Sequence, residues 1–294
     1  MPTALVTGGT GMVGRALIAR LVDDGAEVLA TARSRAAAAD VEALGARPLY
    51  TDVANLGGWR EEASAAEAVW HLGLPRVVPP VRRRAAARMG RRAGDAATAL
   101  AELLDGRPVV LASSGFVYGD RTTPAPADAP LAPIALGAPA LAAERALAAS
   151  GARIVRLPWV YGRGGILRAM VLGLKMRRFR MVGSGANRWS LLAVEDAVEA
   201  LVAAAGRAPG ATNACEDDAP TLAELIGVVC AAPDVRRPDT VPRGMAAFSL
   251  GGAMAEALAV STWLAPDGDG PPPAATWRQR IPELVADPEL IRGP

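Results

Sequence analysis

The sequence is poor in cysteine, histidine and lysine. Its 294 residues include two cysteines, Cys215 and Cys230, and one histidine, and Lys175 is the only lysine. The cysteines are far from a C-x-x-C spacing and no His/Cys cluster accompanies them, which excludes a disulfide framework and a zinc site. We therefore expect no metal in the functional site.

A strong excess of charge is also missing. The 32 basic and 30 acidic residues leave a net charge of +2, which argues against a broad electrostatic grip on nucleic acid or on an anionic membrane. The arginine-rich run Arg82–Arg92 has no aromatic residues between its charges, and we interpret it as a solvated helix face. A small molecule is the expected partner.

Long hydrophobic runs and a secretory leader are missing as well. The residues before the first apolar strand, Ala4–Val6, lack a basic region and a cleavage site. The nearly uncharged stretch Ala246–Ala265 is interrupted by Glu256, glycines and serines, so we interpret it as a buried amphipathic helix and not a membrane span. These features predict a cytoplasmic protein without membrane association.

The chain does have ample apolar material, 51% of its residues, and it alternates short β-rich runs with alanine- and leucine-rich helical patterns. This alternation is typical of βαβ units, so we predict an α/β fold with a Rossmann-type, doubly wound parallel sheet. Residues 1–163 form this domain and residues 164–294 a smaller, mainly helical substrate lobe, with a strand and helix at 190–205 crossing back to the sheet. Strands are expected at Thr3–Thr7, Glu27–Thr31, Arg47–Tyr50, Ala68–Leu72, Val109–Ala112, Arg153–Arg156 and Ser190–Val194. Helices are expected at Gly11–Asp23, Arg35–Leu44, Val81–Leu104, Ala138–Ala149 and Glu195–Ala205.

A glycine-rich turn, Thr7–Gly14, follows the first strand and opens the first helix. Gly8 permits a tight turn, Gly11 lets the backbone approach a pyrophosphate, and Gly14 lets the helix pack closely on the sheet. The N–H groups of the first helical turn then face the phosphates, where the helix dipole favours negative charge. This context predicts a dinucleotide site.

The end of the second strand decides which dinucleotide is expected. Folds that prefer NAD place an acid there to hold the ribose 2′-hydroxyl, but this chain has Ala32 followed by Arg33 and Arg35. A guanidinium suits a 2′-phosphate, so we predict NADP(H). The alternative is that both arginines are ordinary solvated loop charges.

Six motifs in order along the chain resemble the extended short-chain dehydrogenase/reductase family, also called the NAD-dependent epimerase/dehydratase family. They are Thr7–Gly14, Asp52–Val53, Val69–Gly73, Ser113–Gly119, Arg156–Gly162 and Ser190–Ala197. The resemblance, together with the glycine turn, implies cofactor contacts from Gly8, Thr10, Gly11, Met12, Val13, Arg33, Asp52, Val53, Leu72, Gly73, Ser113, Pro158 and Val160. It further implies a homodimer formed through two helices of the nucleotide domain.

The sequence departs from this family at its catalytic pair. The family uses Tyr-x-x-x-Lys to move a proton and hold the nicotinamide ribose, and here Leu136 and Ala140 stand at those positions. The three tyrosines, Tyr50, Tyr118 and Tyr161, are followed four residues later by Ala54, Thr122 and Gly165. The family's helix asparagine is replaced by Ala93, and of the usual set only a serine remains, Ser114.

Three functions stay open. The first is hydride transfer between NADP(H) and a substrate, with Ser114 and Tyr118 as candidate catalytic residues, His71 and Arg83 as substitutes, and the proton coming from water or from the substrate. The second is a redox-neutral isomerisation, dehydration or cyclisation beside a retained cofactor. The third is a non-catalytic NADP(H) sensor.

The second lobe carries methionines and tryptophans that can line an adaptable apolar pocket or belong to the core. They are Met170, Met176, Met181, Trp159, Trp189, Met245, Met254 and Trp263. A basic cluster around Lys175 and Arg178 suits either a phosphate or solvent. We expect an apolar, oxygenated small molecule, such as a secondary metabolite, as the substrate.

Overall fold

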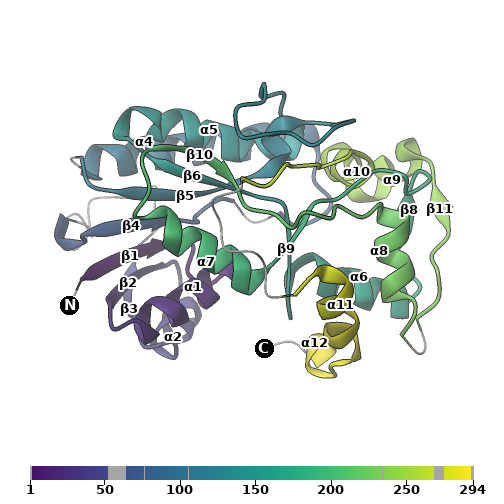
Figure 1. Ribbon diagram of the computed structural model, residues 1–294, viewed down its shortest axis with the longest axis horizontal. Coiled ribbons are helices and arrows are strands. Elements are labelled where there is room, and N and C mark those ends of the chain that lie inside the picture. Colours follow the sequence, from purple (N-terminus) through teal and green to yellow (C-terminus); the bar gives the residue numbers. More distant parts are fainter. Residues whose placement is uncertain are drawn as a thin grey trace.

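A seven-stranded, fully parallel sheet organises the molecule (Figure 1). The computed structural model describes residues 2–51, 64–75, 77–104, 106–232, 235–267 and 275–292. The sheet has the order β10-β6-β5-β4-β1-β2-β3. From β1 the chain adds β2 and β3 on one side and then crosses to add β4 and the later strands on the other, so the strand order reverses between β1 and β4. Ligands of such sheets bind outside the carboxyl ends of the strands at this reversal. The predicted doubly wound α/β fold is confirmed.

The strands of this sheet are β1 (Thr3–Thr7), β2 (Glu27–Ala32), β3 (Arg47–Tyr50), β4 (Ala68–His71), β5 (Val109–Ser114), β6 (Arg153–Leu157) and β10 (Gly210–Asn213). Its helices are α1 (Met12–Asp23), α2 (Arg35–Glu42), α4 (Arg83–Leu104), α5 (Ala138–Leu147) and α7 (Val194–Ala204). Short 3-10 turns η2 (Gly115–Tyr118), η3 (Ala135–Gly137) and η4 (Ala148–Ser150) flank α5.

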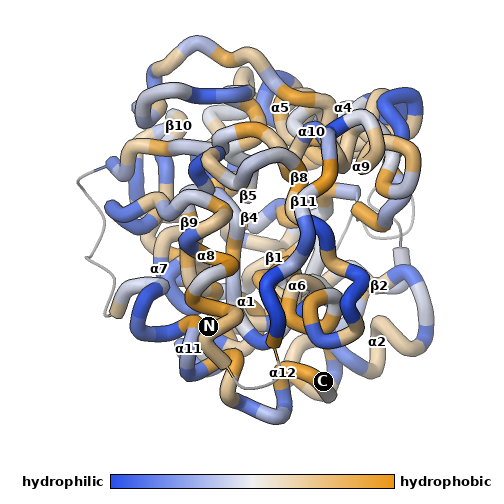
Figure 2. The backbone as a smooth tube through the Cα atoms, turned by 90° about the vertical axis from the view of Figure 1, so that its right-hand side faces the viewer, coloured by the Kyte–Doolittle hydropathy of each residue, from blue (hydrophilic) through white to orange (hydrophobic). Residues whose placement is uncertain are grey.

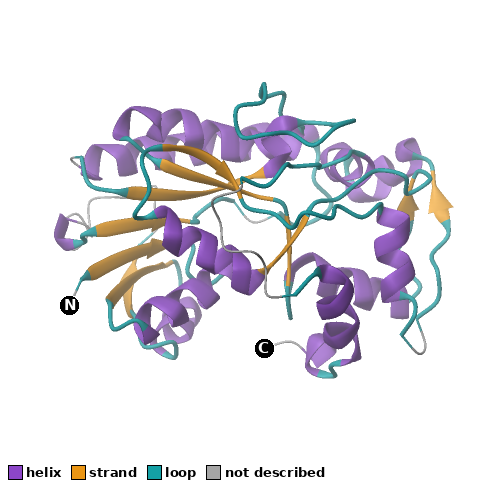
Figure 3. Cartoon of the chain, in the orientation of Figure 1, coloured by secondary structure: helices purple, strands orange, loops and turns teal. Residues whose placement is uncertain are grey.

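Helices cover both faces of the sheet (Figure 3), and the buried residues of its strands divide between two layers. Val6 faces α1 and α7, where Leu17 and Leu201 share its buried cluster. Its neighbour Leu5 faces the opposite side and shares a cluster with Leu100 of α4. Because successive side chains of a strand point to opposite faces, one apolar run serves both layers.

Glycine and alanine let α4 and α5 approach closely. A Cβ atom built on Gly90 would lie 3.4 Å from Cβ of Ala138, and one on Gly94 would lie 3.4 Å from Cβ of Ala142. The loop and turn before α5 are thereby fixed against α4. This is the region to which the sequence assigns the missing catalytic pair.

The second lobe packs around its own apolar cluster, which includes Met170, Trp189 and Trp277. Its elements are β7 (Trp159–Tyr161), α6 (Gly165–Lys175), β8 (Met181–Val182), β9 (Leu191–Ala193), α8 (Leu222–Val229), β11 (Thr240–Val241), α9 (Arg243–Leu250), α10 (Gly252–Ala259), α11 (Trp277–Ala286) and α12 (Glu289–Arg292). Figure 2 looks onto the end of the molecule where α6, α9 and α10 lie.

Two features of this half differ from the sequence analysis. The stretch Ala246–Ala265 is not one buried helix, because α9 and α10 are separated at Gly251, which has φ +80° and approaches the backbone of Val81. β10, for which no strand was predicted, adds an edge to the main sheet beside β6. Within the described residues, no helix has the length and apolar character needed to cross a bilayer.

Candidate active site

A cleft of about 2440 Å³ runs from the carboxyl ends of β1, β2 and β4 to the helices of the second lobe. Pockets for one small ligand usually measure about 300–1,000 Å³, so this space can hold a dinucleotide and a substrate together. Residues at its nucleotide end include Gly8, Thr10, Gly11, Met12, Thr31, Arg33, Leu72 and Gly73. Residues at its other end include Trp159, Met170, Met245, Met254 and Leu258.

The turn between β1 and α1 leaves no room for side chains. Gly8 has φ +77°, and a Cβ atom on it would lie 2.5 Å from the carbonyl oxygen of Leu72. A Cβ on Gly14 would lie 2.3 Å from the carbonyl oxygen of Gly8. The backbone N–H of Gly11 donates to that same Gly8 oxygen at 3.2 Å.

The N-terminus of α1 carries no side-chain cap. Its N-cap is Gly11, no side chain caps the first turn, and that turn contains no acidic residue. Helices α5, α6, α9 and α10 share this lack of a cap, whereas α8 begins with a capping box in which Thr221 and Glu224 satisfy the backbone. What distinguishes α1 is that its first turn follows the close glycine turn at the end of β1. The first N–H groups of a helix lack intrahelical partners and sit at the positive end of its dipole. The first turn of α1 therefore fits the pyrophosphate of a dinucleotide.

Arg33 stands just past the end of β2 and lines the cleft. It is exposed and makes no hydrogen bond or ion pair with the described residues. Its neighbours are occupied, since Ser34 caps α2 by accepting from the N–H of Ala37 at 3.2 Å and Arg15 pairs with Asp40 at 3.3 Å. Arg33 is therefore available to an anionic group at the adenosine end of the cleft.

The predicted cofactor residues divide into those that line the cleft and those that do not. Seven line the cleft, namely Gly8, Thr10, Gly11, Met12, Arg33, Leu72 and Gly73, whereas Val13, Ser113, Pro158 and Val160 do not. Asp52 and Val53 lie outside the described residues. Among the described residues no group of three or more potential metal ligands is found.

His71 ends β4 behind the cleft wall and is 1% exposed. Its Nδ1 lies 2.6 Å from the hydroxyl of Thr7, which also accepts a hydrogen bond from the N–H of Gly73. Burial lowers the pKa of His71 to about 4, so the imidazole is neutral near pH 7. Through Thr7, His71 braces the turn at Gly73. His71 does not line the cleft, so it has no direct contact with a ligand bound there.

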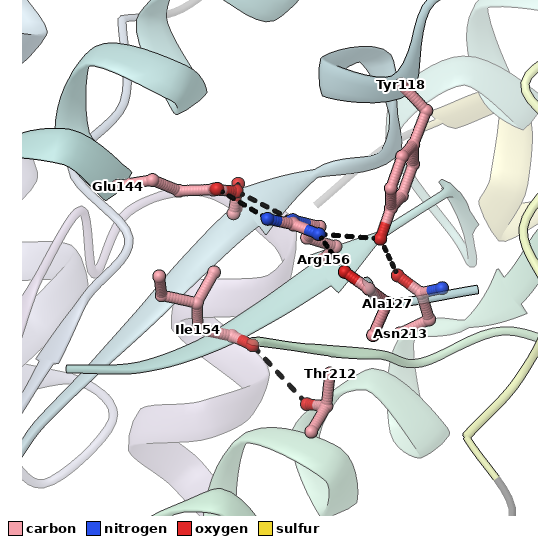
Figure 4. A network of polar contacts seen from close by, with 8 residues as sticks. Tyr118, Ala127, Glu144, Ile154, Arg156, Thr212 and Asn213 are labelled. Atoms are coloured by element: carbon pink, nitrogen blue, oxygen red, sulfur yellow. Dashed lines mark hydrogen bonds and ion pairs between the residues drawn. The ribbon is translucent and has the colours of Figure 1, made fainter. Parts of the chain in front are cut away.

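The side chains of Ser114 and Tyr118, the two candidate catalytic residues, hydrogen-bond to other groups of the protein. The Ser114 hydroxyl caps η2 by accepting from the N–H of Phe116 at 3.3 Å. The Tyr118 hydroxyl accepts from Arg156 and donates to Asn213, each at 2.7 Å (Figure 4). Burial raises the pKa of Tyr118. Neither residue lines the cleft.

Arg156 is the centre of the network in Figure 4. Its guanidinium makes a two-pronged contact with Glu144 of α5 at 2.8 and 3.0 Å and donates to the carbonyl oxygen of Ala127 at 2.8 Å. The side chain of Ser113 also donates to Glu144. These contacts tie β5, β6, β10 and α5 together. The roles that the sequence suggests for Ser113 and Tyr118 stay predictions.

The positions assigned to the catalytic pair are filled by packing. Leu136 is 7% exposed and shares an apolar cluster with Val81 and Val260. Ala140 is 1% exposed and shares another with Val117. Neither lines the cleft.

Glu256 of α10 links the second lobe to the backbone next to Leu136 and to α4. The sequence did not suggest this contact. Its carboxylate accepts from the N–H of Ala135 at 3.1 Å, from Arg83 at 2.8 Å and from Arg243 at 3.2 Å. Arg83, a proposed substitute for the tyrosine, is thus engaged in an ion pair and does not line the cleft.

Of the two tryptophans Trp159 and Trp189, which were expected to line a pocket or to belong to the core, Trp159 lines the cleft and Trp189 is fully buried behind it. Trp159 stacks on Trp189 with ring centroids 4.3 Å apart, and Phe116 meets Trp159 edge-on at 5.0 Å. Arg92 and Asp95 of α4 line the cleft as well. Arg92 and Asp95 are three residues apart, so they lie on the same side of α4. Each is followed by a buried alanine, Ala93 or Ala96.

Comparison with known proteins agrees with this geometry. The model of the NAD dependent epimerase/dehydratase family matches residues 4–214. The chain belongs to this family. Solved structures of its fold include the dTDP-glucose 4,6-dehydratase of Bacillus anthracis in complex with NAD, with a TM-score of 0.79 and 15% identity over 97% of this chain and 96% of the other.

Two further relatives extend the comparison. The UDP-glucuronic acid 4-epimerase of Bacillus cereus, in complex with UDP-glucuronic acid and NAD, has a TM-score of 0.75 and 14% identity, covering 96% of each chain. The 4-hydroxy-2-methyl-3-oxo-4-farnesyl-3,4-dihydroquinoline-1-oxide ketoreductase of Stigmatella aurantiaca is 29% identical over 233 residues, which are 70% of this chain. The match spans 65% of that ketoreductase, just under two thirds of its length. Members of the epimerase/dehydratase family are enzymes that use a nicotinamide dinucleotide, and this chain is expected to bind one.

Proposed function

We propose that the protein is an NADP(H)-dependent enzyme that transfers hydride to or from a small, largely apolar oxygenated metabolite. One observation carries the proposal: the uncapped first turn of α1, closed around Gly8 and Gly14, opens into a cleft that Arg33 also lines. Bound there, the nicotinamide would supply or accept the hydride. The Stigmatella aurantiaca relative supports this choice, because its name describes reduction of a ketone on a farnesyl-bearing substrate.

The residues divide the work of binding. Backbone N–H groups of Thr10, Met12 and Val13 would hold the pyrophosphate, and Arg33 would hold the 2′-phosphate. Contacts of Asp52 and Val53 with the adenine, and of Ser113, Pro158 and Val160 with the nicotinamide end, stay predictions from the sequence resemblance. The homodimer, the cytoplasmic location and the domain boundary at residue 163 also stay predictions.

The proton needs another route than the family's tyrosine. No tyrosine precedes Lys175, the only lysine, by four residues, and Tyr118 is held by Arg156 and Asn213. We propose that water or an acidic group of the substrate supplies the proton. A positioned general acid typically contributes about 10²–10⁴-fold, so turnover slower by that order is expected.

A redox-neutral reaction is the second candidate. It is favoured by the packing of Leu136 and Ala140 at the positions that the family resemblance assigns to the Tyr-x-x-x-Lys pair, since neither side chain can protonate an alkoxide, while the phosphate turn is intact. Orientation of a substrate in the cleft can by itself contribute several kcal/mol to an isomerisation, elimination or cyclisation. The cofactor would then be bound but unchanged after turnover.

Cofactor absorbance during turnover separates the candidates. Purified protein is titrated with NADPH and then mixed with hydrophobic ketones, while NADPH absorbance and product are followed together. Loss of NADPH equal to the alcohol formed supports hydride transfer. Product formed at constant NADPH supports the redox-neutral reaction. Failure to bind NADPH would refute both, and binding without any product would favour the sensor.

A further inference from the structure

The far end of the cleft lies between α6 on one side and the α9–α10 pair on the other. Three methionines from three helices line it, Met170 of α6, Met245 of α9 and Met254 of α10, together with Leu250 and Leu258. Thioether side chains are flexible and polarisable, so they adapt to apolar ligands of irregular shape. This end of the cleft differs in chemistry from the nucleotide end.

Polar side chains on these helix walls are already engaged. Ser249, the polar residue that α9 presents to the cleft, donates its hydroxyl to the carbonyl oxygen of Ala246 within its own helix. Arg168 of α6 turns its guanidinium onto the carbonyl oxygens of Leu290 and Ile291 at 3.0 Å each. The exposed Arg178 and Arg180 line the cleft beyond the end of α6.

A sugar ring is poorly matched to such walls. Each hydroxyl that loses water without gaining a partner costs roughly 1–3 kcal/mol. A hydrocarbon chain gains free energy from the same surface, since burial of apolar area is favourable. We infer that the space between α6 and the α9–α10 pair is a subsite for an extended hydrocarbon chain of the substrate, an assignment that rests on the proposed function.

The apolar surface continues to the open edge of the cleft. Met245 lines the cleft and is still 64% exposed, and Phe248, on the next turn of the same helix, is 95% exposed. On the facing segment Val77 also lines the cleft, and the hydrogen bond from Val81 to the carbonyl oxygen of Leu250 holds that segment beside α9. A chain longer than the subsite would leave along this edge.

Straight-chain ketones test the subsite. Purified protein saturated with NADP⁺ is titrated with the series from hexan-2-one to tetradecan-2-one, and binding is followed by the fluorescence of the tryptophans, of which Trp159 lines the cleft. The dissociation constant should fall by about fourfold for each added methylene over the length that the subsite covers. Affinity that is independent of chain length, or stronger binding by UDP-glucose than by the longest ketone, would overturn the assignment.

Two methionines of the same lobe provide matched variants. Met245 lines the cleft, whereas Met176 is similarly exposed, at 58%, and does not. Met245→Glu should weaken binding of tetradecan-2-one by about tenfold or more, because a carboxylate is costly beside a hydrocarbon chain. Met176→Glu should leave binding unchanged, and both variants should melt at the wild-type temperature. Equal effects of the two substitutions would contradict the subsite.

The measurement also separates this inference from the proposed function. Ketone binding is read from fluorescence, and hydride transfer is read from NADPH absorbance with the same ketones. Chain-length-dependent binding without NADPH consumption would refute hydride transfer alone. NADPH consumption with affinities that do not depend on chain length would refute the subsite alone.

Discussion

Gly14 packs so closely against Gly8 that there is no room for a side chain at position 14. A Cβ atom there would lie 2.3 Å from the Gly8 carbonyl oxygen and 2.9 Å from the Cα of Gly9. The start of α1 is therefore held directly on the turn that leaves β1, with its uncapped N–H groups toward the cleft. We expect cofactor binding to depend on this close contact.

Gly14→Ala should separate α1 from the turn. We expect the free energy of unfolding to fall by about 1–3 kcal/mol from overpacking and NADPH binding to be lost in the protein that still folds. Gly244→Ala in α9 is the control, because no atom lies within 4 Å of its added Cβ, and it should gain up to about 1 kcal/mol. Urea unfolding and NADPH titration check both, and wild-type behaviour of Gly14→Ala would contradict this account.

Arg33→Ala should change the cofactor preference. A hydrogen-bonded charge pair contributes about 1.5–3 kcal/mol, so the dissociation constant for NADPH should rise about 10–100-fold while that for NADH stays constant. Arg35→Ala is the matched control, since Arg35 is also exposed but does not line the cleft. Equal weakening of NADPH and NADH, measured by cofactor fluorescence, would show that Arg33 does not contact a 2′-phosphate.

The parallel sheet and the glycine turn could be predicted because both are local signals. Strands β1, β2, β4 and β5 contain apolar runs, each followed further along the chain by a helical pattern, and the three glycines follow the first strand directly. β10 could not be predicted, because Gly210–Asn213 is short and partly polar and becomes a strand by pairing with β6. The break at Gly251 likewise depends on the backbone of Val81, which is distant in the sequence.

The candidate catalytic residues were harder to assign for the same reason. A serine and a tyrosine beside a strand end resemble a catalytic pair in the sequence, but their surroundings are set by distant residues. Asn213 is 95 positions from Tyr118 and Arg156 is 38, and together they take both hydrogen bonds of its hydroxyl. Burial of Leu136 by Val81 and Val260 is also a tertiary contact that no local pattern announces.

Ala140→Lys should fail to rebuild the family's lysine. Ala140 is 1% exposed among apolar residues, so an ammonium there would be buried. The nearest acid along α5, Glu144, is already paired with Arg156 and Ser113. We expect the free energy of unfolding to fall by about 3–5 kcal/mol, the range seen for an uncompensated buried charge. Ala148→Lys, at an exposed site just after α5, should stay within about 0.5 kcal/mol of wild type. Urea unfolding of both variants measures the difference, and an equally stable Ala140→Lys would show that this position opens to solvent.

His71 should make stability depend on pH in the acid range. Its pKa is lowered from 6.5 to about 4 by burial, so between these values the unfolded chain binds a proton that the folded chain does not. Its contribution is complete above pH 6.5 and is lost as the pH falls toward 4, by a total of about 3 kcal/mol. Burial raises the pKa of Glu216 and Asp196, which gives these carboxyl groups the opposite slope.

The comparison with His71→Asn isolates the imidazole from those carboxyl groups. The difference in unfolding free energy between wild type and this variant, measured in urea from pH 7 to pH 4, should shrink as the pH falls. His71 is the only histidine, so its ring signals in an NMR titration are unambiguous and should not shift until well below pH 6. A midpoint near 6.5 would mean that water reaches the imidazole, and the bracing of Gly73 through Thr7 would then need another explanation.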